Sequence, residues 1–173
     1  MTTPIPLDDR ARELALAHPD DPALTHLAVV GDTYTILVSG EQTAGRYALI
    51  DMLVPAGGGP PPHRHDFEEM FHVLDGRIEV DLRGDTTAAE AGDTVNVPAN
   101  APHNFTNVSH EPARVLCLVA PAGLEAYFTR IGDVVADRAA PAPDLTDAQR
   151  AQRMERAMQL APQYRIENLA EAG

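Results

Sequence analysis

Residues 57–69 read Gly-Gly-Gly-Pro-Pro-Pro-His-Arg-His-Asp-Phe-Glu-Glu. Side chains on a β-strand alternate between its two faces, so residues separated by an even number share a face. His63, His65 and Glu69 meet this condition if the backbone is extended here. Two imidazoles and one carboxylate that converge on a point suit a divalent transition metal. The stretch therefore predicts most of a metal site on a strand.

A second histidine follows the segment Gly-Asp-Thr-Val-Asn-Val-Pro-Ala-Asn-Ala-Pro, residues 92–102. Its Pro and Asn residues are typical of a turn, after which we expect a strand that begins at His103. A neighbouring strand of this kind can supply a fourth ligand to the same ion. Three neutral imidazoles and one carboxylate leave a net positive charge on a divalent metal, which can then bind water, dioxygen or a chelating substrate.

The two segments resemble the two conserved motifs of the cupin superfamily. The pattern G-x5-H-x-H-x3-E-x6-G is matched by Gly57, His63, His65, Glu69 and Gly76. The pattern G-x5-P-x-G-x2-H-x3-N is matched, apart from its inner glycine, by Gly92, Pro98, His103 and Asn107. Asn100 replaces that glycine, and we expect the turn to persist because Asn tolerates left-handed backbone geometry.

The resemblance implies an all-β fold, a single cupin barrel of the double-stranded β-helix or jelly-roll type. It also implies that one divalent transition metal is held by His63, His65, Glu69 and His103. Imidazole and carboxylate donors suit Fe, Ni, Mn, Co and Zn alike, so the metal is left open. Cupins of this size are commonly dimers, and the resemblance implies a homodimer here.

The chain divides into an N-terminal arm (1–27), a barrel (28–120) and a C-terminal helical extension (121–173). In the arm, residues 9–17 predict a short helix that ends before Pro19. In the barrel, strands are expected at 33–39, 46–54, 70–74, 77–82, 94–97, 103–108 and 114–119. Asp75-Gly76 predicts a hairpin, and residues 83–85 predict the next turn. The extension predicts helices over 124–131 and, after a capping box at 146–149, through residue 160.

The composition excludes several classes of function. The formal net charge is -13, from 13 Lys+Arg and 26 Asp+Glu, so nucleic acid and anionic membranes are not expected as partners. All basic residues are arginines, which excludes a lysine Schiff base. The single cysteine, Cys117, lies in an apolar run and is expected to be a buried, inert thiol. No apolar stretch is long enough to span a membrane, and the N-terminus lacks a secretory pattern, so we expect a cytoplasmic protein.

Residues that share the parity of the ligands are expected to line the same cavity. These candidates for a substrate pocket are Tyr47, Phe67, Phe71 and Phe105, with Leu49, Asp51 and Val73 beside them. His72 and Glu68 have the opposite parity and should face away, although a one-residue bulge would exchange Glu68 and Glu69. The remaining histidines flank prolines or turns and are expected at the surface: His18, His26 and His110.

Three functional hypotheses remain open at this stage. The stretch 55–65, the segment 121–125 and the helical tail are similar to small bacterial cupins of the quercetin dioxygenase-like type, which implies a dioxygenase for a small enolic or aromatic, flavonol-like substrate. In that case Glu69 is the catalytic residue, because a carboxylate on a metal can also accept a proton from a bound enol or hydroxyl. The alternatives are a non-oxidative metal-dependent isomerase, cyclase or lyase, and a cupin that binds a small ligand without catalysis.

Overall fold

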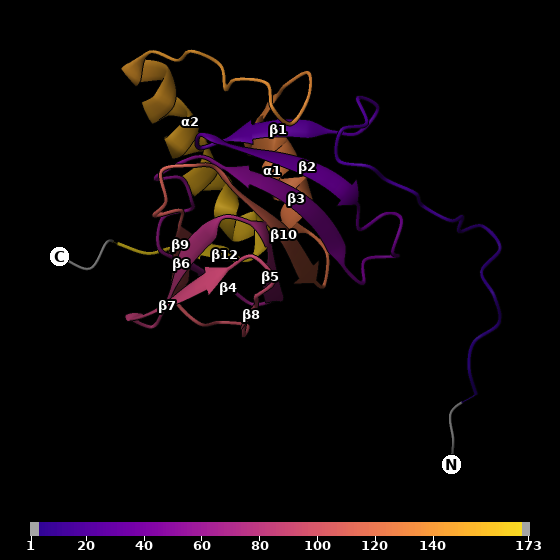
Figure 1. The fold of residues 1–173 in the computed structure, drawn as a ribbon. Helices are drawn as coiled ribbons and strands as arrows, with labels where there is room; N and C mark the ends of the chain where they lie inside the picture. The colour runs from indigo at the N-terminus through magenta and orange to yellow at the C-terminus, as the bar shows by residue number, and fades with distance from the viewer. Residues whose placement is uncertain (1–3, 171–173) are drawn as a thin grey trace.

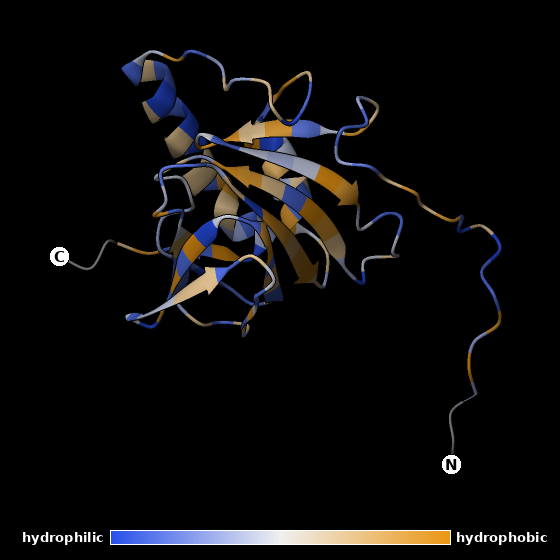
Figure 2. Ribbon diagram, viewed as in Figure 1, coloured by the Kyte–Doolittle hydropathy of each residue, from blue (hydrophilic) through white to orange (hydrophobic). Residues whose placement is uncertain are grey.

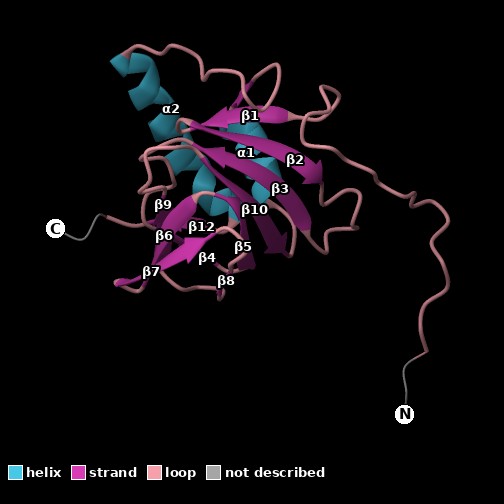
Figure 3. Ribbon diagram, viewed as in Figure 1, coloured by secondary structure: helices cyan, strands magenta, loops and turns pink. Residues whose placement is uncertain are grey.

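The computed structural model describes residues 4–170. Within that range two antiparallel sheets fold into a barrel (Figure 1; Figure 3). The seven-stranded sheet has the order β11 (Asp133–Val134), β1 (His26–Val29), β2 (Asp32–Val38), β3 (Ala48–Val54), β10 (Ala113–Ala120), β5 (Glu68–Asp75), β8 (Thr94–Val97). The five-stranded sheet has the order β12 (Ile166–Asn168), β4 (His63–His65), β9 (His103–Thr106), β6 (Arg77–Leu82), β7 (Asp85–Glu90). This architecture confirms the predicted all-β cupin barrel.

The hydrophobic core lies inside the barrel. Along β10 every second residue is fully buried, as Val115, Cys117 and Val119 show. The same alternation places apolar bands on the strands of the large sheet (Figure 2). Side chains from both sheets meet inside, where Phe71 of β5 and Phe105 of β9 pack with ring centroids 5.0 Å apart. Burial of apolar area on the inner face of each strand drives the two sheets together.

The C-terminal helices cover one side of the barrel. Helix α1 (Leu124–Ile131) packs against β1 and β3, and α2 (Asp147–Leu160) packs against α1. As predicted, α1 ends at Gly132, and α2 opens with a capping box in which Thr146 and Gln149 exchange hydrogen bonds. The 3-10 helix η1 (Ala161–Tyr164) then leads into β12. Within residues 4–170 neither helix meets the length and hydropathy that a membrane span requires.

The prediction of a helix over residues 9–17 is wrong. The arm has no regular structure there and runs away from the barrel (Figure 1). Ile5, Leu7, Leu14 and Leu16 are all more than 90% exposed. A short helix in water is marginal unless tertiary packing covers its apolar face, and nothing in the described chain packs on this one.

The predicted hairpin at Asp75-Gly76 is also wrong. Strand β5 pairs with β8 and β10, whereas β6 pairs with β7 and β9. Gly76, with a φ of 78°, therefore turns the chain from one sheet into the other. A Cβ at this position would lie 3.0 Å from the Cα of Ala113, so the close approach of β10 also favours glycine. The turn at Arg83-Gly84 does form a hairpin, between β6 and β7.

Candidate metal centre and cavity

The two sheets bring the four predicted ligands together. His63 of β4 and His103 of β9 are direct partners across the small sheet, and His65 follows on the same face as His63. Glu69 comes from β5 in the large sheet, so the prediction of a single strand for His63, His65 and Glu69 is wrong. One potential ligand atom from each of His63, His65, Glu69 and His103 lies within 4.8 Å of all the others. The cluster thus joins both halves of the barrel.

A turn before β9 aims His103 into the barrel. Asn100 has a φ of 69°, so it adopts the left-handed geometry expected of a residue that replaces glycine. Its N–H donates to the carbonyl of His65 at 2.6 Å, which ties the two ligand-bearing segments together.

Backbone carbonyl groups fix the orientation of all three imidazoles. Each Nδ1 lies 2.9 Å from a carbonyl oxygen two residues away: His63 with Pro61, His65 with Phe67, and His103 with Ala101. A carbonyl oxygen only accepts hydrogen bonds, so each Nδ1 carries the hydrogen. The Nε2 atoms are left as the coordinating atoms, the usual arrangement of metal-binding histidines.

The position of Glu69 fits a cation at the centre of the cluster. Its Oε2 lies 3.0 Å from Nε2 of His65 and 3.0 Å from Nε2 of His103. With hydrogen on Nδ1, a neutral imidazole turns its Nε2 lone pair towards the carboxylate, and two such contacts repel unless positive charge lies between them. A divalent metal, or protons on the rings, supplies that charge.

Burial and hydrogen bonding set the protonation states of these ligands. Burial alone raises the pKa of Glu69, but when the rings of His103 and His65 carry protons on both nitrogens, their hydrogen bonds outweigh burial and hold the pKa below its usual range. Burial, reinforced by the nearby His103, lowers the pKa of His63 to about 4. Near pH 7, Glu69 is therefore charged and His63 neutral, which are the states that bind metal.

Cys117 contacts the metal site, which the sequence did not reveal. The residue is fully buried, as predicted, but its thiol donates to Oε1 of Glu69 at 3.2 Å. Burial and the charge of Glu69 raise the pKa of the thiol well above its usual value, so the group stays protonated. The thiol therefore holds the oxygen of Glu69 that does not face the histidines.

We expect Cys117→Val to weaken zinc binding by about tenfold, because groups that orient metal ligands contribute on this scale. Cys117→Ser keeps a donor for Glu69 and is expected to bind zinc nearly as tightly as the wild type. Competition with a chromogenic chelator measures both affinities. Equal affinities for wild type and Cys117→Val would show that this contact does not position the ligand.

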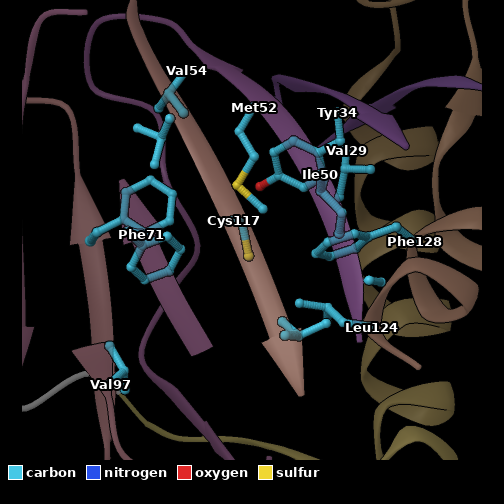
Figure 4. Close-up of a cluster of buried hydrophobic side chains, with 14 of the residues drawn as sticks. Val29, Tyr34, Ile50, Met52, Val54, Phe71, Val97, Cys117, Leu124 and Phe128 are labelled. Atoms are coloured by element: carbon cyan, nitrogen blue, oxygen red, sulfur yellow. The ribbon is translucent and has the colours of Figure 1, made fainter. Parts of the chain in front are cut away.

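An apolar cavity adjoins the cluster and is covered by the C-terminal helices. His63 and Glu69 form part of its wall, together with Phe71 and Phe105 as predicted. The remaining wall includes four residues that parity did not select: Tyr34, Met52, Tyr127 and Phe128. Figure 4 shows several of these side chains inside the barrel. Such a cavity, mostly apolar with a few polar groups, is the usual form of a small-molecule site.

Two of the four predicted pocket residues lie elsewhere, as do the three candidates named beside them: Leu49, Asp51 and Val73. Phe67 stacks on the ring of His65, with centroids 3.8 Å apart, and is not part of the cavity wall. Tyr47 is 41% exposed and outside the cavity. In β3 the inward residues are even-numbered, as buried Ala48 and Ile50 show, so the odd parity of the ligands does not carry over. Asp51 accordingly faces outward and pairs with Arg114.

The other acidic and histidine side chains follow the predictions with one exception. Glu68 faces away from the cluster and accepts hydrogen bonds from Asn96 and the backbone of Ala99, so no bulge exchanges it with Glu69. His72 also faces away and contacts Thr94. The exception is His26, predicted at the surface but 1% exposed. It is buried because its Nδ1 contacts the Thr35 hydroxyl at 2.8 Å on the neighbouring strand.

The two-sheet barrel and the cluster of three histidines and a glutamate, of which His63 and Glu69 line the cavity, have the arrangement that the sequence resemblance implies. Residues 50–119 match the family model described as the cupin domain. Over these residues, which include His63, His65, Glu69 and His103, the chain is similar to the cupin domain.

Individual proteins resemble parts of the chain. Quercetin 2,3-dioxygenase of Bacillus subtilis (strain 168) is 28% identical over 100 residues, which cover 57% of this chain and 29% of that protein. Polyketide synthase CurC of Streptomyces cyaneus is 34% identical over 94 residues, which cover 53% of this chain and 60% of that protein. The chain thus spans less than two thirds of the length of either relative.

A solved structure supports the fold. The polyketide cyclase RemF from Streptomyces resistomycificus superposes with a TM-score of 0.56 at 20% sequence identity, covering 78% of this chain and 89% of that chain. At this identity the likeness shows the fold alone.

Proposed function

We propose that the protein is a metal-dependent dioxygenase that acts on a small enolic or aromatic, flavonol-like substrate. The observation that carries the proposal is the cluster of three imidazoles and the Glu69 carboxylate, of which His63 and Glu69 form part of the wall of an apolar, aromatic cavity. The similarity of residues in this domain to a quercetin 2,3-dioxygenase supports the choice of substrate class.

The residues of the cluster have different roles in this proposal. His63, His65 and His103 hold the ion, which when bound supplies a Lewis acid for an enolic oxygen and a site for dioxygen. Glu69 accepts the proton of the substrate hydroxyl through its carboxylate, and Cys117 keeps that carboxylate in position. The apolar wall, with Phe71 and Phe105, packs against the substrate ring and excludes water.

Oxygen uptake tests the proposal directly. The protein is loaded in turn with Fe2+, Ni2+, Mn2+ and Co2+, its metal content is measured, and each form is supplied with quercetin, 3-hydroxyflavone and acetylacetone. We expect at least one metal form to consume oxygen with one of these substrates. Glu69→Gln is expected to reduce the rate by at least about 100-fold, the scale of a lost general base. No uptake with any combination would refute the dioxygenase.

A second candidate is a non-oxidative metal-dependent cyclase or isomerase. The specific observation in its favour is the 34% identity to the polyketide synthase CurC, higher than that to the dioxygenase. A Lewis-acidic metal with Glu69 as the base suffices for such chemistry. Turnover that proceeds equally well without oxygen, and with Zn2+ in the site, would favour this candidate. A tightly bound ligand that is recovered unchanged would instead favour a binding protein.

A further inference from the structure

The cavity holds a polar group that the metal site does not use. Tyr34, on β2, forms part of the wall, is 4% exposed and packs its ring against Phe128 at 4.7 Å between centroids. Its hydroxyl points into the barrel beside Met52, the residue opposite it on β3 (Figure 4). A buried tyrosine hydroxyl needs polar partners. The groups around the Tyr34 oxygen therefore indicate whether it donates or accepts a hydrogen bond in the cavity.

Asp32 fixes the hydrogen of this hydroxyl. The Tyr34 hydroxyl donates to Oδ2 of Asp32 at 3.0 Å, and the carboxyl group is 1% exposed. Because the single hydrogen is committed to Asp32, the lone pairs of the Tyr34 oxygen remain available. The cavity therefore offers a hydrogen-bond acceptor on a wall formed by the large sheet, on a strand other than the one that carries Glu69.

The burial of the Asp32 carboxyl group lowers the stability of the fold. Its Oδ1 is buried without a hydrogen-bond partner among the described residues, and lies 2.5 Å from where a Cβ on Gly58 would be. Burial raises the pKa of Asp32 to about 7, even though the Tyr34 hydroxyl and the backbone N–H of Gly59 act in the opposite direction. Such perturbed, incompletely satisfied carboxyls are concentrated at functional sites.

We propose that Tyr34, held by Asp32, is a second anchor of the cavity and accepts a hydrogen bond from a hydroxyl group of the bound small molecule. The inference rests on the proposed function, since it assumes a ligand that binds at the metal through an enolic or phenolic oxygen. It narrows the substrate class to such compounds with a further hydroxyl group. A site built around a hydroxyl discriminates against the analogue that lacks it, because its buried polar atoms are then left unpaired.

Matched ligand pairs test this anchor in the Co2+-loaded protein. Kojic acid and allomaltol are enolic chelators that differ by one hydroxyl, and quercetin and 3-hydroxyflavone form a larger pair. Dissociation constants come from absorbance titrations. For at least one pair we expect the wild type to bind the hydroxylated member at least about tenfold more tightly, and Tyr34→Phe to bring that ratio close to one by weakening only that member. Tyr164→Phe, in a tyrosine outside the cavity wall, is expected to leave the ratio unchanged.

Tyr34→Phe also removes the hydrogen-bond donor to the buried carboxyl of Asp32. The double variant Asp32→Asn/Tyr34→Phe therefore tests the loss of the Tyr34 hydroxyl without leaving a buried carboxylate beside it. Co2+ content is measured for each variant first. Loss of discrimination in either variant supports the anchor. The anchor is overturned if the ratio of dissociation constants within a pair is unchanged in both variants. It is also overturned if the wild type binds neither ligand pair, or does not discriminate within either pair. Oxygen uptake is measured separately. If the wild type discriminates between the ligands of a pair but no metal form consumes oxygen, the Tyr34 anchor is supported and the dioxygenase is refuted. If a metal form consumes oxygen but the wild type does not discriminate, the dioxygenase is supported and the anchor is refuted.

Discussion

Replacing His103 by alanine is expected to lower the affinity for Zn2+ or Co2+ by at least about 100-fold, or about 2.8 kcal/mol. His103 supplies one of four ligand atoms that lie within 4.8 Å of one another, and its loss also leaves Glu69 with one fewer partner for its buried charge. Elemental analysis after dialysis against a weak chelator measures the effect. The rise in melting temperature at a given metal concentration is expected to be much smaller in this variant, because the stabilisation by a metal falls as its dissociation constant rises.

His72→Ala is the matched control for this variant. His72 lies on the same strand as Glu69 but on the opposite face, where it contacts Thr94. This variant is expected to retain full metal content and the full shift in melting temperature. If His103→Ala binds metal as tightly as His72→Ala does, the four-residue cluster is not the metal site.

Replacing Asp32 by asparagine is expected to stabilise the protein relative to the wild type as the pH rises. The pKa of Asp32 is about 7 in the folded protein against an ordinary value of 3.8, because of burial. A raised folded-state pKa favours the protonated fold, so the wild type loses stability as the pH climbs from 3.8 through 7. The full loss is about 4 kcal/mol, of which about 2 kcal/mol falls between pH 5.5 and pH 8.

Urea unfolding at pH 5.5 and pH 8 measures this difference. The asparagine amide brings its own cost in a site with an unpartnered oxygen, but that cost does not depend on pH, so the change between the two pH values isolates the charge. Asp85→Asn, at an exposed position on β7, is expected to show the same pH dependence as the wild type. A difference between Asp32→Asn and wild type that stays constant with pH would mean that Asp32 is already ionised in the fold below pH 5.5.

Rules that use only neighbouring residues, such as strand alternation and helix capping, predicted the structure correctly where a short segment determines its own conformation. The spacing of His63 and His65 assigned them to one face, and both lie on that face of β4 in the cluster. The capping box at Thr146 and the turn at Asn100 also follow from local hydrogen bonding and backbone preference. These features depend on residues a few positions apart, so no knowledge of the sheet is needed.

Local rules failed where distant strands decide the outcome. Asp75-Gly76 has the composition of a hairpin, yet the strands it joins belong to different sheets. Strand β12, from the C-terminal segment, pairs with β4, which carries the ligands His63 and His65. No sequence pattern in residues 166–168 predicts this pairing. The helix expected over 9–17 is absent because no surface covers its apolar residues.

By itself the sequence determined the donor set, because two motifs that resemble those of cupins name His63, His65, Glu69 and His103. Only the tertiary structure decided the cavity. It places Tyr34 and Met52 in the wall and Tyr47 outside it, and it brings Asp32 to the Tyr34 hydroxyl and Cys117 to Glu69. The reason is physical. Alternation along a strand tells which residues share a face, but which face turns inward depends on the register with strands far away in the chain.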